Sequence, residues 1–494
     1  MKITSLIIGG FKGIDSRANI PLAPVTLLFG ANSTGKSTLL QGFLYLYEVL
    51  VKRNLNPQYS SLAGKKVYLG GFENLVHGKG KNGTITLGAT LQFEDDDVWD
   101  DYTSAAEYHL FDSSIQYYPE AKSRQWSFEL EIGWDRFQKT PYIKKYQCYA
   151  DQQFICRFEK KPGNPGSYIS FYKPINSWKA PQFAGPLSDM FGVELSQPIG
   201  LANQLHALPD INSRISLDDV FWEWEQMFEE HPLACKTFFE ASFSQAVLAP
   251  LQHLVKRLDD LLHIGPLRII PDKGFTALNE YRKDRWYDGS GGWDEFINGG
   301  ESARNRVNDW WSGNLGHFNT PSGFNTPYAF HTVDNEFNPL GQQYVYVTNN
   351  ESGINHSLTE LGIGVSQVFP FVVASCMNKN AIVSCEQPEL HIHPAWQLVL
   401  GDMMLESVKN NPDKMFLVET HSEHLMLRLL KRRRNTAEEE EIPMQLRCAK
   451  EDIQIIFCEQ ERGKTRLLPI ATTDEGEFDA PWPNGFFRER VKEV

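Results

Sequence analysis

The chain has few cysteines, no long apolar run and no excess of positive charge, and each shortage excludes a class of protein. Its 494 residues include 7 cysteines without any C-x-x-C pair, which argues against a disulfide framework or a structural zinc site. No stretch approaches the roughly 18–20 apolar residues that span a bilayer. The net charge of −14 argues against a surface broadly attractive to nucleic acid or anionic membrane, although it allows a local basic groove. We therefore expect a cytoplasmic protein without a membrane partner.

A glycine-rich segment at residues 30–38 matches the pattern G-x-x-x-x-G-K-[ST]. An apolar run at residues 25–29 precedes it, and a helix-forming stretch at residues 39–44 follows. Strand, glycine loop and helix are the context in which this pattern cradles phosphates with backbone N–H groups. Lys36 is expected to reach the terminal phosphates, and Ser37 to ligate Mg²⁺. The residues predicted to bind the nucleotide are Gly30, Asn32, Ser33, Thr34, Gly35, Lys36, Ser37 and Thr38.

A second segment, far along the chain, supplies the carboxylate that such a site needs. Residues 381–386 form an apolar run that ends in Glu386, as expected of a buried strand that delivers an acid to its carboxyl end. A carboxylate in that position can hold Mg²⁺ beside a phosphate loop. The sequence therefore predicts a nucleoside triphosphate site whose metal ion is held by Ser37 and Glu386.

Further motifs resemble those of a known family. Residues 386–394 read E-Q-P-E-L-H-I-H-P, and a later strand is followed by Thr420-His421-Ser422. Together with the phosphate loop, these motifs resemble the OLD-like (overcoming-lysogenization-defect-like) branch of the ABC-type ATPase clan. That branch carries E-[EQ]-P-E-x-x-x-H-P, then a strand and T-H-S. The other matching segments are residues 263–268, 361–367 and 482–487.

The resemblance implies an α/β fold, an ABC-type ATPase head (P-loop NTPase). An antiparallel β lobe and a helical insertion are expected between the Walker motifs. The expected regions are an N-terminal half of the head with the phosphate loop, a β-rich lobe, a helical insertion and a C-terminal half of the head. Their boundaries are residues 1–95, 96–175, 176–262 and 263–494.

The resemblance also implies a head-to-tail dimer, or a higher homo-oligomer, that binds ATP and Mg²⁺ between subunits. His421 takes the switch position that senses the γ-phosphate. Residues 361–367 are similar to the branch's signature motif, which closes over the γ-phosphate of the other subunit. The residues expected to act in this way are Gly362, Gly364, Ser366 and Gln367.

One position departs from the pattern of the wider clan. The residue after the metal carboxylate is commonly a glutamate that activates the attacking water, whereas this chain has Gln387. An amide holds water but does not accept a proton at neutral pH. Three interpretations follow: Glu389 replaces the base, hydrolysis is slow and the protein acts as a latch, or the chain binds ATP without hydrolysing it. The candidate catalytic residues are Glu386, Gln387, Glu389 and His421.

The biological interpretation rests on analogy with the branch. The sequence after His421 has no D-x-D and about 70 residues, so we expect no Toprim nuclease domain. Stand-alone members resemble ATPase subunits of bacterial anti-phage systems of the PARIS or Septu type, which control a separate nuclease or toxin. The alternatives are a RecF-like ATPase that handles DNA ends and an ATP-gated scaffold that does not hydrolyse ATP. Arg268 is expected either to reach a phosphate or to brace a domain joint.

Overall fold

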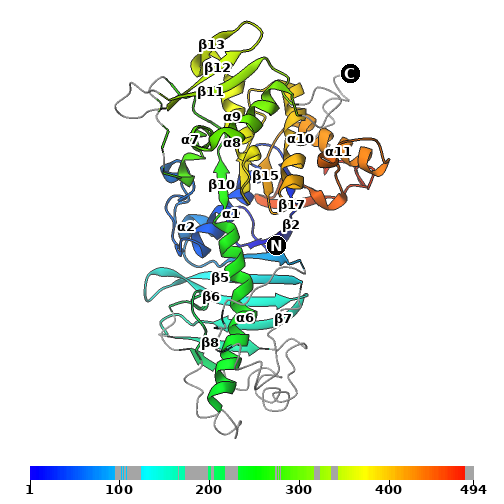
Figure 1. The fold of residues 1–494 in the computed structure, drawn as a ribbon. Helices are drawn as coiled ribbons and strands as arrows, with labels where there is room; N and C mark the ends of the chain where they lie inside the picture. The colour runs from blue at the N-terminus through cyan, green and yellow to red at the C-terminus, as the bar shows by residue number, and fades with distance from the viewer. Residues whose placement is uncertain are drawn as a thin grey trace. The chain divides into compact units, whose positions relative to one another are not determined.

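The computed structural model describes residues 1–94, 102, 104, 107, 124–164, 166–172, 199–201, 205–216, 232–272, 275, 277–278, 280–315, 323–334 and 343–483. Much of the predicted helical insertion, at residues 176–198 and 217–231, lies outside these residues, as does the end of the last motif at residues 484–487. The chain divides into two compact units (Figure 1). The first comprises Met1–Pro21, Tyr45–Gln58 and Leu69–Asp259, and the second comprises Leu22–Leu44, Tyr59–Tyr68 and Asp260–Val494.

The second unit is built on a six-stranded sheet whose order is β10-β14-β15-β3-β16-β17. Neighbouring strands are parallel, except that β17 returns antiparallel to β16. The bounds are β3 Val25–Phe29, β10 Leu261–Ile264, β14 Ile382–Glu386, β15 Met415–Glu419, β16 Ile453–Glu461 and β17 Lys464–Ile470. The strand order matters for function because β15 lies between β14 and β3, so the carboxyl ends of all three strands meet at one edge.

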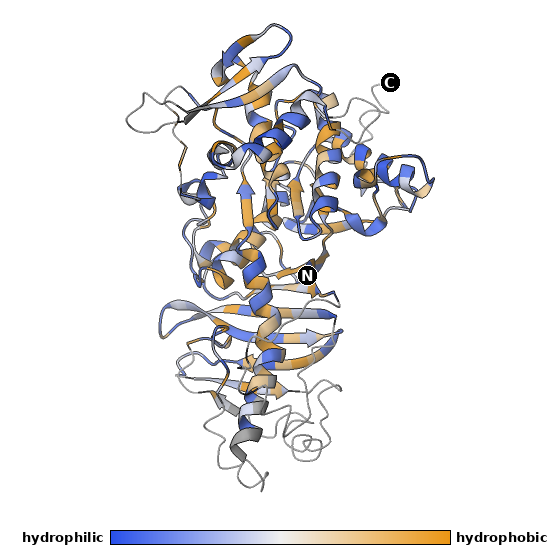
Figure 2. Ribbon diagram, viewed as in Figure 1, coloured by the Kyte–Doolittle hydropathy of each residue, from blue (hydrophilic) through white to orange (hydrophobic). Residues whose placement is uncertain are grey.

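The central strands are apolar along their whole length. Every residue of β3 and of β15 is buried, and in Figure 2 β15 is drawn in the orange of hydrophobic residues. A parallel strand with both faces covered reads as a continuous apolar run rather than an alternating one. The strands predicted at residues 25–29 and 381–386 are therefore present, the second as β14 Ile382–Glu386.

Six helices belong wholly or partly to this unit: α1 Lys36–Leu50, α7 Ser290–Asn298, α8 Gly300–Ser312, α9 Ile363–Cys376, α10 Pro394–Asn410 and α11 Glu423–Ala437. Helices α10 and α11 pack against each other, as Figure 1 shows. A small antiparallel sheet adds β11 Tyr328–Asp334, β12 Gln343–Asn349 and β13 Ile354–Ser357. Short 3₁₀ turns are η1 Gly64–Lys66, η4 Lys283–Arg285, η5 Leu358–Glu360, η6 Met444–Leu446 and η7 Lys450–Asp452.

Residues 272–341 are rich in glycine, asparagine, tryptophan and tyrosine, a composition that predicts loops around short helices, and this prediction is wrong in part. This segment contains α7, α8 and β11, and its tryptophans enter the core. Trp293 stacks on Phe369 of α9 with ring centroids 3.8 Å apart, and Trp311 stacks on Phe324. Glycine and asparagine indicated loops, but the burial of large aromatic side chains outweighs the weak local propensity of their neighbours.

The first unit contains an eight-stranded antiparallel sheet in the order β2-β1-β4-β5-β6-β7-β8-β9. Its bounds are β1 Lys2–Gly9, β2 Ala18–Pro21, β4 Ile85–Gln92, β5 Gln125–Asp135, β6 Thr140–Ala150, β7 Gln153–Glu159, β8 Ser167–Tyr172 and β9 Ile199–Leu201. Among the described residues of this unit, two helices accompany it, α2 Phe72–Leu75 and α6 Pro232–Leu258. Helix α6 lies on the sheet, where Phe243 packs against Phe158 of β7 and Tyr172 of β8.

The helical pattern expected through Leu262 ends earlier than expected. Helix α6 stops at Leu258, and Leu261 begins β10, which pairs in parallel with β14. An apolar run such as Leu258–Leu262 fits a buried helix and a buried strand equally well, so periodicity alone does not separate them. Among the described residues, no helix is both long and apolar enough to cross a membrane.

Candidate nucleotide site

The phosphate loop has the backbone that its two glycines permit. Gly30 has φ +149° and Gly35 has φ +105°, both in the region that favours glycine. A Cβ on Gly30 would lie 2.3 Å from the carbonyl oxygen of Cys458, and one on Gly35 would meet Thr465. Between them, Ser33 takes φ +64° at the exposed tip of the loop. The loop thus depends on both glycines for its path and for its contact with β16 and β17.

Lys36, the first residue of α1, turns back into the loop. Its side chain is only 4% exposed, and Nζ donates to the carbonyl oxygens of Gly30 at 3.0 Å and Ala31 at 2.9 Å. Burial lowers the pKa of Lys36, and the nearby charge of Glu419 opposes that shift. The ammonium group is thereby held against the backbone of the phosphate loop.

Glu419, the last residue of β15, meets the phosphate loop directly. Ser37 Oγ donates to Glu419 Oε2 at 2.7 Å, and Glu419 Oε1 lies 4.0 Å from Lys36 Nζ. Burial raises the pKa of the Glu419 carboxyl, whereas the hydrogen bond from Ser37 opposes that rise. The structure thus brings together residues that are 382 positions apart in the sequence.

Glu386, the predicted metal carboxylate, stands beside Glu419 in the parallel register of β14 and β15. Its Oε1 lies 3.3 Å from Nε2 of His263, a residue of β10 that is 1% exposed. The other ring nitrogen, Nδ1, is 3.0 Å from Ser384 Oγ. A buried imidazole with partners on both nitrogens has a fixed orientation, so His263 holds the Glu386 carboxylate in place.

The loop after β14 contains two strained residues. Gln387 has φ +47° and His391 has φ +65°, an uncommon conformation for side-chain-bearing residues that clusters at functional sites. The backbone N–H of Gln387 donates to the carbonyl oxygen of Glu419 at 2.7 Å, which ties the loop to β15. The position of Gln387 is therefore set in part by its backbone contact with the end of β15.

Glu389 and His421 adjoin each other at the same edge. The backbone N–H of His421 donates to Glu389 Oε1 at 2.7 Å, whereas Glu389 Oε2 is buried without a hydrogen-bond partner among the described residues. Burial raises the pKa of Glu389, against the hydrogen bond from His421. Burial and the charge of Lys36 lower the pKa of His421. A carboxylate with a raised pKa and a neutral imidazole are suited to proton transfer.

The signature-like segment exposes its backbone and buries its polar side chains. Gly362 and Ile363 are exposed at the start of α9, whereas Ser366 is 1% and Gln367 is 4% exposed. Ser366 Oγ has no hydrogen-bond partner within the described part of the chain. A Cβ on Gly364 would lie 2.4 Å from the carbonyl oxygen of His391. Among the described residues, this segment forms no hydrogen bond with the phosphate loop. Its expected action, closing over the γ-phosphate of a second subunit, stays a prediction.

Arg268 braces a joint rather than reaching the phosphate loop. It is 5% exposed, and its side chain donates to the carbonyl oxygens of Gln367 at 3.0 Å and of Glu386 at 2.6 Å. The side chain of Gln367 forms two hydrogen bonds with the backbone of Arg268. Its Nε2 donates to the Arg268 carbonyl oxygen, and its Oε1 accepts from the Arg268 N–H. The first turns of α9 and the end of β14 are thereby fastened together.

Two residues of this site were not predicted from the sequence, Glu419 and His263. The signal for Glu419 was present, because residues 415–419 form an apolar run that ends in a carboxylate, as residues 381–386 do. For His263, only its place in a matching motif marked it. The pairing with Glu386 depends on the adjacency of β10 and β14, which no local pattern reveals.

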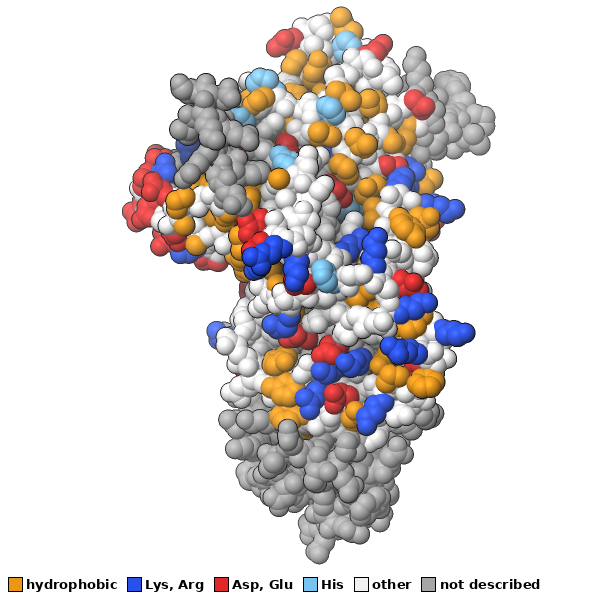
Figure 3. Space-filling model, turned by 180° about the vertical axis from the view of Figure 1, so that it is seen from behind, with side chains coloured by type: hydrophobic (Ala, Val, Ile, Leu, Met, Phe, Trp, Pro, Cys, Tyr) orange, Lys and Arg blue, Asp and Glu red, His pale blue; other side chains and the backbone are white. Residues whose placement is uncertain are grey.

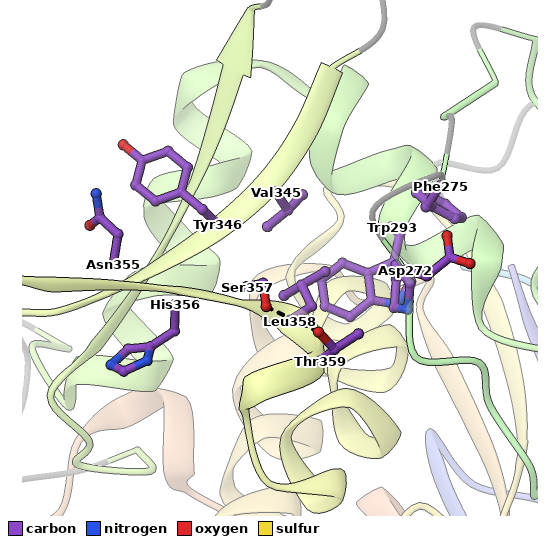
Figure 4. A pocket seen from close by; sticks show the side chains of 11 residues that line it. Asp272, Phe275, Trp293, Val345, Tyr346, Asn355, His356, Ser357, Leu358 and Thr359 are labelled. Carbon is purple, nitrogen blue, oxygen red and sulfur yellow. Dashed lines mark hydrogen bonds between the residues drawn. The ribbon is translucent and has the colours of Figure 1, made fainter.

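A cavity of about 600 Å³ lies elsewhere in the second unit, away from the phosphate loop (Figure 4). Its walls come from β12, β13, η5, Trp293 of α7 and the segment around Asp272, and the Ser357 and Thr359 hydroxyls lie 3.0 Å apart within it. The described residues that line it include no lysine or arginine. Since a triphosphate needs cationic or backbone N–H partners, the phosphate loop is the better site for a nucleotide.

Comparison with known proteins gives one family match and several solved structures. A family profile described as an AAA ATPase domain matches residues 308–426. No curated protein is significantly similar to the chain. Three solved SMC structures align with nearly the whole chain at low identity. A head bound to the C-winged helix domain of ScpA has 10% identity and a TM-score of 0.39, over 95% of this chain and 98% of that chain.

The second is an SMC head with an extended coiled coil, bound to the C-terminal domain of ScpA derived from Pyrococcus furiosus. It has 9% identity and a TM-score of 0.39, with 95% and 96% coverage. The SMC head domain from Thermotoga maritima has 8% identity and a TM-score of 0.38, with 96% and 100% coverage. The strand order and the phosphate loop after β3 define an α/β fold with an antiparallel sheet, and together with the family match over residues 308–426 they are consistent with an ATPase head of the ABC type.

Proposed function

We propose that the protein binds ATP with a divalent metal ion, Mg²⁺, and hydrolyses it to ADP and phosphate. The observation that carries this proposal is the convergence of Lys36 and Ser37 with Glu419 at one edge of the sheet. Lys36 neutralises charge on the terminal phosphates, and the Ser37 hydroxyl ligates the metal ion. The fit to a metal is supported by the hard oxygen donors of Ser37 and Glu419, which suit Mg²⁺.

Glu389 is the group that we propose as general base in place of Gln387. It has an oxygen without a partner among the described residues and a raised pKa, so its carboxylate binds a proton more readily than a surface carboxylate does. Gln387 orients the attacking water through its amide. The competing proposals are a slow ATPase that acts as a latch and a scaffold that only binds ATP.

At the level of the assembly, we propose a homodimer of heads in which the exposed start of α9 closes over the nucleotide of the other subunit. ATP binding then changes the state of a separate effector protein, a nuclease or toxin, in an anti-phage system. This part rests on the similarity of the motifs to the OLD-like branch and on the exposed Gly362 and Ile363.

The alternative, direct handling of DNA ends, requires a basic surface. Figure 3 shows Lys and Arg side chains interspersed with Asp and Glu on the face that it presents. On the eight-stranded sheet, Lys145 pairs with Glu131 at 2.6 Å and Arg157 lies 3.5 Å from Glu159. Cations that are paired with carboxylates attract phosphate weakly, so the charges on this sheet do not favour the alternative.

The test is phosphate release by the purified chain with ATP and Mg²⁺, together with binding of the fluorescent analogue mant-ATP. The wild type is expected to bind and turn over, and Lys36→Ala to lose both. The matched control is Lys52→Ala, which removes an exposed lysine from the region just after α1. Binding without measurable turnover would support the scaffold instead, and an active Lys36→Ala variant would exclude the phosphate loop as the site.

A further inference from the structure

The cavity of about 600 Å³ beside the small antiparallel sheet lies outside the proposed ATPase site. None of the described residues that line it belongs to the phosphate loop, β14 or β15. We propose that this cavity binds a nucleoside, that is, a nucleobase with its sugar and without phosphate groups. The inference does not depend on the proposed function, because it concerns a second site in the same unit.

The size and the apolar walls of the cavity suit a flat organic molecule. Small-molecule pockets measure about 300–1,000 Å³ and combine apolar and aromatic walls with a few polar groups that orient the ligand. Here the apolar walls are Trp293 of α7, Val345 of β12, Leu358 of η5 and the nearby Phe275. Aromatic walls favour a ligand that has an aromatic ring, because rings pack against one another in stacked and edge-to-face contacts.

Polar groups lie on the same side of the small sheet as the apolar wall. His356 of β13 pairs with Val347 of β12, and Val347 shares a strand face with Val345. Figure 4 shows His356 and Asn355 on opposite sides of β13. The imidazole of His356 and the hydroxyl of Thr359 can each donate and accept a hydrogen bond. The edge of a nucleobase and the hydroxyl groups of a sugar need partners of this kind.

The indole of Trp293 supplies a hydrogen-bond donor at the wall of the cavity. Trp293 is 0% exposed, and its ring stacks on Phe369 with centroids 3.8 Å apart. Its Nε1 has no hydrogen-bond partner among the described residues. Because buried donors in proteins are nearly always paired, an unpaired donor beside a cavity indicates an acceptor on a ligand.

The charge of the cavity disfavours a nucleotide. Asp272 is one of its walls, whereas the described lining residues provide no lysine or arginine. A phosphate group in this place would face a carboxylate without a cation to compensate its charge. The exocyclic amino group of a base, in contrast, can donate to that carboxylate. The cavity therefore selects the uncharged nucleoside over its monophosphate.

The experiment is calorimetric titration of the full-length chain with adenosine, guanosine, cytidine and uridine, and with the four 5′-monophosphates. Saturating ATPγS and Mg²⁺ keep the phosphate loop occupied. The variants are His356→Ala, which removes a polar group, and Thr359→Trp, which places an indole in the cavity. His331→Ala is the matched control, because His331 lies on β11 of the same sheet, stacks on Tyr346 and is not among the described lining residues. Melting temperatures check that each variant is folded.

We expect at least one nucleoside to bind, and its monophosphate to bind about 10-fold or more weakly, because an unpaired charge is costly to bury. His356→Ala should weaken nucleoside binding by about 3–10-fold, the effect of losing one hydrogen bond. Thr359→Trp should abolish this binding, and His331→Ala should leave it unchanged. Lys36→Ala should keep the wild-type affinity for the nucleoside, although the proposed function requires it to lose ATP.

Four results would overturn the inference. They are the absence of nucleoside binding at about 1 mM, equal affinity for the monophosphate, wild-type affinity in Thr359→Trp, and loss of nucleoside binding in Lys36→Ala. The last result would assign the nucleoside to the phosphate loop. If Thr359→Trp does not fold, wild-type affinity in His356→Ala overturns the inference in its place. A wild type that binds a nucleoside but no ATPγS contradicts the proposed function alone.

Discussion

At the scale of single residues, the chain has an amide, Gln387, directly after Glu386 and a carboxylate, Glu389, two positions after that amide. Gln387 is held by its backbone in a left-handed conformation, and Glu389 receives the N–H of His421. The geometry of this loop separates two roles: Gln387 can orient water, whereas Glu389 can take its proton.

The first prediction concerns Glu389→Gln. If Glu389 is the base, the substitution lowers kcat by about 10²–10⁴-fold and leaves mant-ATP affinity unchanged. Burial raises the pKa of Glu389, and only the deprotonated form accepts a proton, so wild-type kcat should rise with pH through that raised pKa. The variant should lack this acidic limb in a profile of phosphate release against pH. Glu423→Gln, at the start of α11, is the matched control, and an unchanged profile in Glu389→Gln would assign the base elsewhere.

A second residue-scale prediction concerns Lys414, which is 1% exposed and donates to the carbonyl oxygens of Ser375 and Met377 at 2.8 Å each. Burial lowers the pKa of Lys414 from 10.5 to about 7. Between these values the unfolded chain binds a proton that the folded chain does not, so the free energy of unfolding rises with pH across this window. Below pH 7 both states are protonated and the full cost of burying the ammonium group is present.

Lys414→Met should remove this contribution. The measurement is urea denaturation from pH 7 to pH 10, and the quantity is the difference between wild type and variant, because tyrosines and cysteines titrate in both. The free energy of unfolding of the wild type, minus that of the variant, should rise as the pH increases from 7 to 10. A constant difference would show that the ammonium group keeps its proton in the fold.

At the scale of elements, the sequence correctly predicts those strands and helices whose apolar pattern and boundaries lie within the segment itself. The run at residues 25–29 is a strand, and the segment that begins at Lys36 is a helix, because each carries its own apolar pattern and its own boundary. The sequence does not predict strand β11, because its residues lie in a segment rich in glycine and asparagine. Strand β11 exists because it pairs with β12 and packs on α8, and neither contact is visible in the local sequence.

The same limit applies to the site. The phosphate loop and Glu386 were found because each follows a strand and has a known pattern. The contact between Ser37 and Glu419 depends on β15 lying between β14 and β3. Strand order is a property of the whole sheet, so the partner of Ser37 could not be chosen from motifs alone.

The element-scale prediction concerns the joint between α9 and β14. Arg268→Ala leaves the carbonyl oxygens of Gln367 and Glu386 without their donors in the interior. Each buried polar group left unsatisfied costs about 1–3 kcal/mol, so a loss of that order is expected in urea denaturation. Gln367→Ala and the double variant complete a thermodynamic cycle. Strictly additive losses would show that the two residues do not act as one brace.

At the scale of the whole molecule, the start of α9 offers a way to separate folding from assembly. A side chain on Gly362, at φ −59°, would meet nothing within 4 Å of its Cβ, whereas one on Gly364 would collide with the backbone of His391. A residue with a side chain can therefore replace Gly362 without a clash between its Cβ and the rest of the chain. Any effect of a large residue there must come from a partner.

We expect Gly362→Trp to keep the wild-type free energy of unfolding within about 0.5 kcal/mol, as surface substitutions do, and to lose the homodimer that we propose for the chain with ATPγS and Mg²⁺. Light scattering coupled to size exclusion measures the dimer. Gly200→Trp is the control, because that glycine in β9 also has open space around it. Dimers of normal mass in Gly362→Trp would exclude the start of α9 from the interface.

The brace formed by Arg268 has a consequence for signalling. Because it fastens α9 to the strand that carries Glu386, we expect a displacement caused by nucleotide at one end to be transmitted to the other. Coupling of this kind is reciprocal: whatever factor ATP contributes to the affinity of α9 for its partner, the partner contributes to the affinity for ATP. A partner that binds α9 more tightly when ATP is bound would therefore raise the affinity of the head for ATP without touching the nucleotide.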